Sequence, residues 1–287
     1  MKIKILLLAL LSFLITSNAF SQLDKPVFQF GIGISEPMDQ LKGNDYVVYA
    51  PNGFIYIDTN FITNNYAAKT GIQFFGAAKI NFDKYSITRG VAFISYNSFN
   101  TFQSSKSGVT GILIAGDTLP TSVNYNYSFS NFAIGFGFEV APSAFTNIVS
   151  PFAGVNLSLN FMGGELTRTE NSYDTNRVGF SGFRIGVNFN GGIEVKLNKN
   201  FGIVAGIKYD LGNLLLKNND RSISGRMEWG RTNIELNDEE GQFYSNIYSP
   251  IGGQFESYTN EEKKVNWGTV YLGINFYPNI GKKTTKK

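Results

Sequence analysis

Hydrophobic and polar residues alternate with a period of two in about eight separate segments of the chain. The segment 131–140 shows the pattern most regularly. Its apolar face carries Phe132, Ile134, Phe136, Phe138 and Val140. Its other face carries Asn131, Gly135, Gly137 and Glu139. Because successive side chains of a β-strand point to opposite faces, the alternation predicts strands with one apolar and one polar face.

Further segments repeat this alternation at about the ten-residue length that a tilted membrane strand requires. They cover residues 28–34, 72–82, 153–161, 183–196, 201–210 and 269–276. Another segment, third in chain order, is weaker. Its Val91 and Phe93 continue the outward phase of the neighbouring segments, which places Arg89 on the lipid side as well. Either Arg89 extends toward the lipid headgroups, or a bulge near Gly90 reverses the phase.

An alternating strand also suits a soluble sheet with one wet face, so a β-sandwich or a lipocalin-like barrel is the alternative fold. Two features favour a membrane. The polar faces are mostly Gly, Asn and Ser with a few charges of both signs, which suits a narrow lumen. The connections alternate between short ones (83–84, 141–150, 198–200) and long ones (36–67, 100–124, 165–177, 215–265). The sequence therefore predicts an all-β, closed, antiparallel up-and-down transmembrane barrel of about eight strands with long extracellular loops.

Two of the long connections contain further strand signals. Residues 46–49 and 54–57 flank Asn52-Gly53, a dipeptide that strongly favours a hairpin. Each arm is too short to cross a bilayer, so we expect this hairpin to stand above the barrel; if it did cross, the barrel would have ten strands. The stretch 223–236 is a candidate for an outward extension of the seventh strand.

The N-terminus has the features of a secretory signal peptide. Lys2 and Lys4 precede an apolar run over residues 5–15, which is shorter than the roughly 20 residues of a membrane-spanning helix. Cleavage is expected between Ser21 and Gln22, with a cut after Ala19 or an uncleaved anchor as the alternatives. The expected organisation is a signal peptide (1–21), an outer-membrane barrel (22–281) and a Lys-rich periplasmic tail (282–287). The expected location is the cell outer membrane.

With 31 Gly, 26 Phe and 15 Tyr but only 16% charged residues, the composition favours strands over helices. The chain has no Cys, which excludes disulfides and thiolate metal sites. It also has no His, which removes the commonest metal ligand and every His-dependent nucleophile. We therefore expect neither an enzyme nor a cofactor. A net charge of +3 without a basic stripe gives no sign of nucleic-acid binding.

Several charged residues fall on the predicted lumen faces, namely Lys79, Glu139, Arg184, Glu194, Lys196, Lys208 and Asp210. The interior of an eight-stranded barrel is just wide enough for side chains to fill it, so buried charges there must pair. We expect a structural salt-bridge network that plugs the barrel, with a proton or ion pathway as the alternative. The acidic runs 238–240 and 261–262 are expected to be solvated, with acid–base chemistry or a divalent-ion site as alternatives.

Several stretches resemble the small outer-membrane barrel proteins of the OmpX-like and PorT-like kind common in the Bacteroidota. They are residues 28–33 (FQFGIG), 134–139 (IGFGFE), 150–154 (SPFAG) and 271–277 (YLGINFY). The resemblance covers nearly the whole mature chain and implies location and architecture rather than an activity. It also implies that Phe276 and Tyr277 form the signal read by the barrel-assembly machinery, although a Lys-rich tail follows them here. The implied partners are outer-membrane lipid and that machinery.

Two function classes follow from this barrel. The first is a structural or interaction barrel, whose filled lumen passes nothing and whose extracellular loops bind a partner that the sequence does not identify. The second is a porin-like barrel that transports small solutes or a hydrophobic ligand. Eight strands leave no aqueous channel, so the sequence favours the first class.

Overall fold

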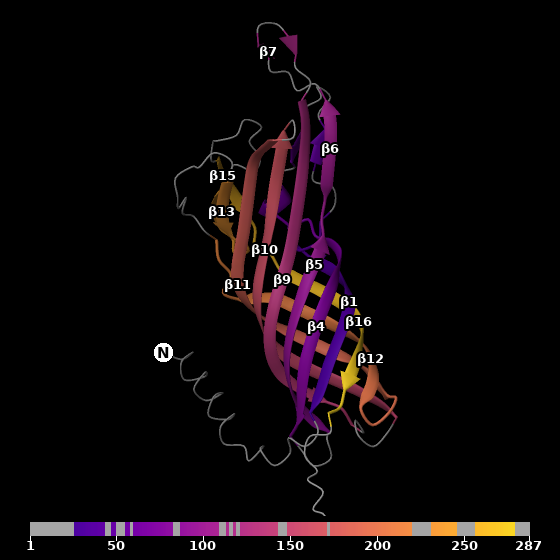
Figure 1. Ribbon diagram of the computed structural model, residues 1–287. Coiled ribbons are helices and arrows are strands. Elements are labelled where there is room, and N and C mark those ends of the chain that lie inside the picture. The colour runs from indigo at the N-terminus through magenta and orange to yellow at the C-terminus, as the bar shows by residue number, and fades with distance from the viewer. Residues whose placement is uncertain are drawn as a thin grey trace, which may run out of the picture.

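The computed structural model of the chain describes residues 26–43, 47–49, 55–57, 60–82, 87–108, 113–114, 117–118, 121–142, 148–170, 173–219, 231–245 and 256–278. The expected signal peptide, the Lys-rich tail and the turn 83–84 lie outside these residues. Within them, eight strands close into one barrel (Figure 1). These strands are β1 (Val27–Asp39), β4 (Lys69–Asn81), β5 (Thr88–Asn100), β9 (Thr121–Val140), β10 (Val149–Glu170), β11 (Tyr173–Lys196), β12 (Phe201–Leu215) and β16 (Val265–Phe276).

Each barrel strand pairs antiparallel with both of its neighbours, and β16 closes the ring between β12 and β1. Following the paired residues once round the barrel from Phe28 leads back to β1 at Met38, a shift of 38 − 28 = 10 residues. For eight strands spaced about 4.8 Å apart, this shift corresponds to a strand tilt of about 40°. The closed antiparallel barrel predicted from the alternation is therefore confirmed, with eight strands rather than ten.

The outward face of the barrel is an exposed apolar belt. On β9 the outward side chains are apolar from Phe132 to Val140, and polar Ser130, Ser128 and Asn126 follow. The eight residue steps from Phe132 to Val140 span about 20 Å along the barrel axis at this tilt, measured between backbone positions. The lower edge of the belt carries Phe28, Phe82, Phe138, Phe201 and Phe276, and the upper edge carries Phe74, Tyr96, Phe132, Phe161, Phe183 and Tyr209. All of these rings are exposed.

The third predicted strand, β5, differs from expectation. Arg89, Val91 and Phe93 are only 0%, 6% and 8% exposed, and all three side chains face the lumen. Ile94 and Tyr96 occupy the outward face instead. The pairing with β4 runs without a shift past Gly90, so there is no bulge at this point. The outward assignment of Val91 and Phe93 was wrong, and neither explanation offered for Arg89 holds, because Arg89 joins carboxylates inside the barrel.

Three strands continue well beyond the belt and form a tall wall, β9–β10–β11, on one side of the barrel (Figure 1). Residues 165–177 were expected to be a long loop, but β10 runs to Glu170 and β11 starts at Tyr173. This expectation was wrong because the segment completes a ladder, in which Leu166 pairs with Val178 and both side chains are buried. The wall therefore continues beyond the exposed apolar belt as a paired sheet.

Two short strands pair with strands of this wall. The strand β6 (Gln103–Gly108) pairs with β9, and β13 (Arg231–Glu235) pairs parallel with β11. The suggestion that 223–236 prolongs the seventh strand was therefore wrong for its described part, because β13 lies against β11 instead of continuing β12.

The remaining elements form small separate sheets and one short helix. The expected hairpin is present as β2 (Val47–Tyr49) paired with β3 (Ile55–Ile57), outside the barrel sheet. Two further hairpins pair β7 (Leu113–Ile114) with β8 (Asp117–Thr118), and β14 (Gly241–Ser245) with β15 (Glu256–Asn260). The helix is α2 (Asn60–Thr63). None of the helices in the described part of the chain is long and apolar enough to cross a membrane.

Candidate functional site

Two basic and two acidic side chains meet inside the lower half of the barrel and form what we call the charge quartet: Lys79, Arg89, Glu139 and Glu194. Lys79 Nζ lies 3.0 Å from Glu139 Oε2 and 3.0 Å from Glu194 Oε1. Arg89 Nη1 donates to Glu194 Oε2 at 2.9 Å, and Arg89 Nη2 donates to Glu139. Each cation thus contacts both carboxylates. All four side chains are at most 3% exposed, so the quartet is a buried, electrically neutral ring.

The barrel register explains why these four residues meet. Arg89 pairs directly with Glu139 across β5 and β9. Lys79 on β4 and Glu194 on β11 come from opposite sides of the ring, with three strands between them in either direction. The shift of ten residues per turn places all four within about 4 Å of one another along the barrel axis. The ion pairs therefore cross the lumen and tie distant strands together.

Lys208 and Asp210 lie above the quartet and do not belong to it. Lys208 Nζ donates to Gln73 Oε1 at 3.1 Å and lies 4.0 Å from the ring centre of Phe75 and 5.2 Å from that of Tyr271. Such contacts with ring faces stabilise a cation in a dry environment. Asp210 accepts a hydrogen bond of 2.8 Å from Asn188 Nδ2. The single network expected from the sequence is therefore divided along the barrel axis.

Amide and hydroxyl groups fill the space around Lys208. Asn97 Oδ1 accepts hydrogen bonds of 2.9 Å from both Ser35 Oγ and Gln73 Nε2. Gly31 and Gly135 leave room for the rings of Phe75 and Phe93, because a Cβ at either glycine would collide with the ring. The cavity between the quartet and Lys208 has a volume of about 20 Å³ and is lined by Gln29, Phe75, Ala77, Lys79, Val91, Phe93, Asn156, Asn188, Asn190, Lys208 and Tyr271. That volume holds roughly one water molecule.

Arg184, another residue of the expected network, lies near the top of the lumen. Its Nη2 lies 2.7 Å from Asp238 Oδ1, and its Nε donates to Asp238 Oδ2 at 2.8 Å. Asn213 Nδ2 donates to the same carboxylate at 2.8 Å. The expectation of a solvated acidic run at 238–240 was therefore wrong for Asp238, which is fully buried as the partner of a lumen arginine.

The other four residues of the expected acidic runs, Glu239, Glu240, Glu261 and Glu262, do lie at the surface. Glu239 and Glu240 line a hollow with Lys217, Gly241 and Glu262. Lys217 Nζ lies 2.5 Å from Glu262 Oε1. Among the described residues, no group of three or more His, Cys, Asp or Glu side chains is arranged to hold a metal ion.

Aromatic residues at the end of the last strand lie at the lower end of the barrel. At the lower end, Lys196 Nζ lies 5.6 Å from the ring centre of Tyr277, and Tyr277 N donates to Asn200 O at 2.8 Å. Phe276 lies on the outward face and pairs with both Phe28 and Phe201. The role of Phe276 and Tyr277 as an assembly signal stays a prediction.

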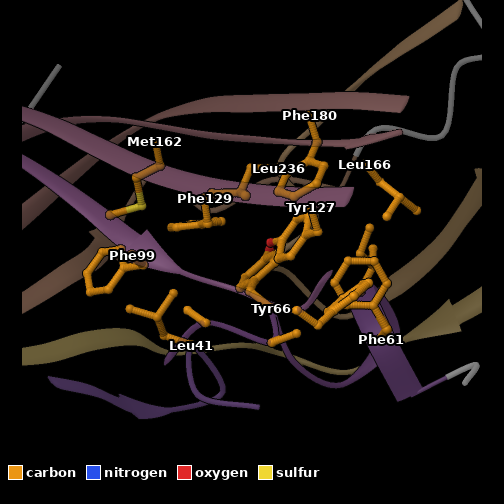
Figure 2. Packing of buried hydrophobic residues seen from close by; sticks show 14 of the residues in the cluster. Leu41, Phe61, Tyr66, Phe99, Tyr127, Phe129, Met162, Leu166, Phe180 and Leu236 are labelled. Carbon is orange, nitrogen blue, oxygen red and sulfur yellow. The ribbon is translucent and has the colours of Figure 1, made fainter. Parts of the chain in front are cut away.

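At the upper end, the barrel mouth holds a cluster of buried apolar residues, whose packing Figure 2 shows. This mouth cluster includes Leu41, Phe61, Tyr66, Phe99, Tyr127, Phe129, Met162, Leu166, Phe180 and Leu236. The ring centres of Phe61 and Tyr127 are 4.8 Å apart, and those of Tyr66 and Phe129 are 5.4 Å apart. Sequence reasoning missed this cluster, because Phe61 and Tyr66 fall in an expected loop. Their large apolar rings in that loop were the available signal.

Polar contacts hold the loops over the mouth. Tyr66 Oη donates to Asn237 O at 2.8 Å. Lys263 Nζ donates to Thr63 O at 3.1 Å and lies 5.4 Å from the ring centre of Tyr66. Burial lowers the pKa of Lys263 to about 7, against the opposing effect of the nearby carboxylates of Asp238 and Glu261. These polar contacts and the mouth cluster together hold the loop residues at the upper end of the barrel.

Comparison with known proteins gives matches among solved structures only. No family model and no curated protein matches the chain. Neisserial surface protein A is 13% identical, with a TM-score of 0.41, and the match covers 88% of this chain and 96% of that one. Ail, the attachment invasion locus protein of Yersinia pestis, is 10% identical, with a TM-score of 0.38, and the match covers 89% of this chain and 99% of that one. The fold described above rests on this chain's own strand pairings.

Proposed function

We propose that the chain is an integral outer-membrane protein that keeps its lumen closed and acts through the part that stands above the membrane. The exposed apolar belt supports the membrane location. Phe30, Ile34 and Leu272 are each more than 60% exposed, and a belt of such residues between two aromatic edges is what a bilayer covers in transmembrane barrels. In water, the same surface would be a severe aggregation hazard.

The orientation follows from the two ends of the barrel. Connections at the lower end are short, as periplasmic turns are in such barrels, and the tall wall rises at the other end. From Phe132 at the belt edge, β9 continues to Thr121, which is about 28 Å further along the axis at this tilt. The outward side chains of this part include Asn126, Ser128 and Ser130, which suit water and a polar partner.

The observation that supports a closed lumen is the series of side-chain groups that follow one another along the barrel interior. The charge quartet crosses the lower half, and the cavity above it has room for roughly one water molecule. Arg184 and Asp238 follow, and the mouth cluster lies on top. An interior occupied in this way disfavours the passage of a hydrated solute. This occupancy supports an interaction barrel over the porin-like alternative.

Planar-bilayer recording of the purified, refolded protein tests the proposal. Insertion is checked first in vesicles, where a folded barrel resists SDS and changes its gel mobility on boiling, because it has no free sheet edge. We expect no steady conductance from wild-type protein, with a general porin as the positive control. Steady channel openings from protein that passes the gel test would overturn the closed lumen and favour transport.

A further inference from the structure

The outer end of β12 carries three adjacent exposed leucines. Leu214, Leu215 and Leu216 are 49%, 59% and 55% exposed. Scattered exposed leucines are ordinary, but an adjacent group forms a contiguous apolar patch that is unfavourable in water. Sequence reasoning placed this point at the start of the last long loop, where no lipid contact was expected.

A built irregularity in the barrel wall holds the leucines in place. Val187 pairs with Leu211 but Ile185 pairs with Leu215, so β12 uses 215 − 211 = 4 steps where β11 uses 187 − 185 = 2. The side chain of Asn213 connects β12 at this point to Asp238 and to the chain at the start of β16. Its Nδ2 donates to Asp238 Oδ2 and to Lys263 O, both at 2.8 Å, and its Oδ1 accepts from Val265 N at 2.8 Å.

The backbone turns sharply just after this irregularity. Leu216 has a φ of 65°, a conformation that is unfavourable for a leucine. Such strain persists only where the surrounding structure enforces it. The exposure of the leucines is therefore a feature of the folded wall and not of a frayed strand end.

The level of the leucines matches the upper edge of the apolar belt. Leu215 pairs with Ile185 of the belt, and neighbouring strands differ by about 3 Å along the axis at this tilt. Leu215 therefore lies at nearly the level of Phe183, which marks the upper edge on β11. On the next strand, β16, the apolar outward face ends lower, at Val270, and Gly268 follows.

We propose that Leu214, Leu215 and Leu216 insert into the outer leaflet of the membrane and contact lipid near the glycerol level. This proposal rests on the membrane location proposed above. Continuity with the belt identifies the occupant as lipid, because Leu215 adjoins Ile185 and lies level with Phe183. The leucines extend the lipid contact of the barrel next to β16, whose apolar outward face ends at a lower level.

Depth-dependent fluorescence quenching tests this proposal, because the chain has no native Cys that would compete for a label. The variant Leu215→Cys carries a bimane label and is refolded into phosphatidylcholine vesicles. The quenchers are iodide in the water and two brominated lipids, one brominated near the glycerol end of the acyl chain, which reports position 215, and one near its middle, which reports position 189. The controls are Phe189→Cys in the middle of the belt and Asn126→Cys on the tall wall. Each labelled protein must first pass the SDS gel test, and Leu214→Cys replaces any 215 variant that fails.

We expect the label at 215 to show quenching by brominated lipid and loss of iodide quenching, as at 189 and opposite to 126. Iodide quenching at 215 equal to that at 126 would overturn lipid contact. Shielding from both quenchers would also overturn it, because protein would then cover the leucines. If the label at 189 also fails to contact lipid, the membrane location itself fails, and the two failures are thereby distinguished.

Discussion

Replacing Glu194 with Gln keeps the shape of the side chain and removes one of the two carboxylates of the charge quartet. In the wild-type protein, Lys79 Nζ lies 3.0 Å from Glu194 Oε1, and Arg89 Nη1 donates to Oε2 at 2.9 Å. In the variant, both cations face Glu139 alone, at a site where their side chains are at most 1% exposed. One positive charge is then buried without a partner. Removing one member of a buried ion pair costs about 3–5 kcal/mol.

The free energy of unfolding of the refolded protein, measured by urea titration in lipid vesicles, checks this value. The matched control is the double variant Lys79→Met with Glu194→Gln. It leaves Arg89 and Glu139 as a neutral pair, and it should recover much of the loss because the uncompensated charge is gone. A uniform packing defect would instead make the double variant worse than the single one.

The reasoning fails if Glu194→Gln unfolds within about 1 kcal/mol of the wild-type protein, which is the range of exposed ion pairs. That result would mean that water reaches the quartet and screens its charges. It would also count against a closed lumen, because the quartet is the group that occupies the lower half of the barrel interior.

Two further predictions concern the barrel faces and the mouth. Phe189→Arg places a charge in the middle of the lipid-facing belt, so it should lower the free energy of unfolding by about 2–4 kcal/mol and impair insertion into vesicles. Asn188→Ala on the lumen face should lower it by about 1–3 kcal/mol, and the variant should still insert. Equal insertion yields of the two variants would contradict the assignment of the two faces. Burial lowers the pKa of Lys263 from its ordinary 10.5 to about 7, so between those values the unfolded chain binds a proton that the folded protein lacks. Stability should therefore rise with pH across this window, by up to about 1.4 kcal/mol per pH unit. Lys263→Met should abolish that rise in urea titrations at a series of pH values, and an unchanged pH profile would refute it.

Local alternation was enough to predict most of the barrel, because side-chain direction along a strand depends only on residue spacing. Phe132, Ile134 and Phe136 face outward as expected, and Asn131 and Glu139 face the lumen. The rule failed on β5, where lumen positions hold apolar residues. There, hydrophobicity alone could not distinguish a side chain that meets lipid from one that packs inside.

The partners of the lumen charges could not be read from the sequence in the same way. Lys79 and Glu194 are 115 residues apart and meet only because the closed barrel and its register bring them to one level. Arg89 was assigned outward and so was left out of the expected network. A lumen position for Arg89 would have supplied the second cation that Glu139 and Glu194 share.

The sequence by itself determined the strands, their faces for most of the barrel, and the alternation of short and long connections, since each of these is a local property. Only the tertiary structure decided which side chains meet inside the barrel and where the wall rises above the belt. Phe61 and Tyr66 look like loop residues in isolation, yet they pack on Tyr127 and Phe129 from a distant strand. Such contacts depend on strand register summed around a closed ring, and no local pattern contains that information.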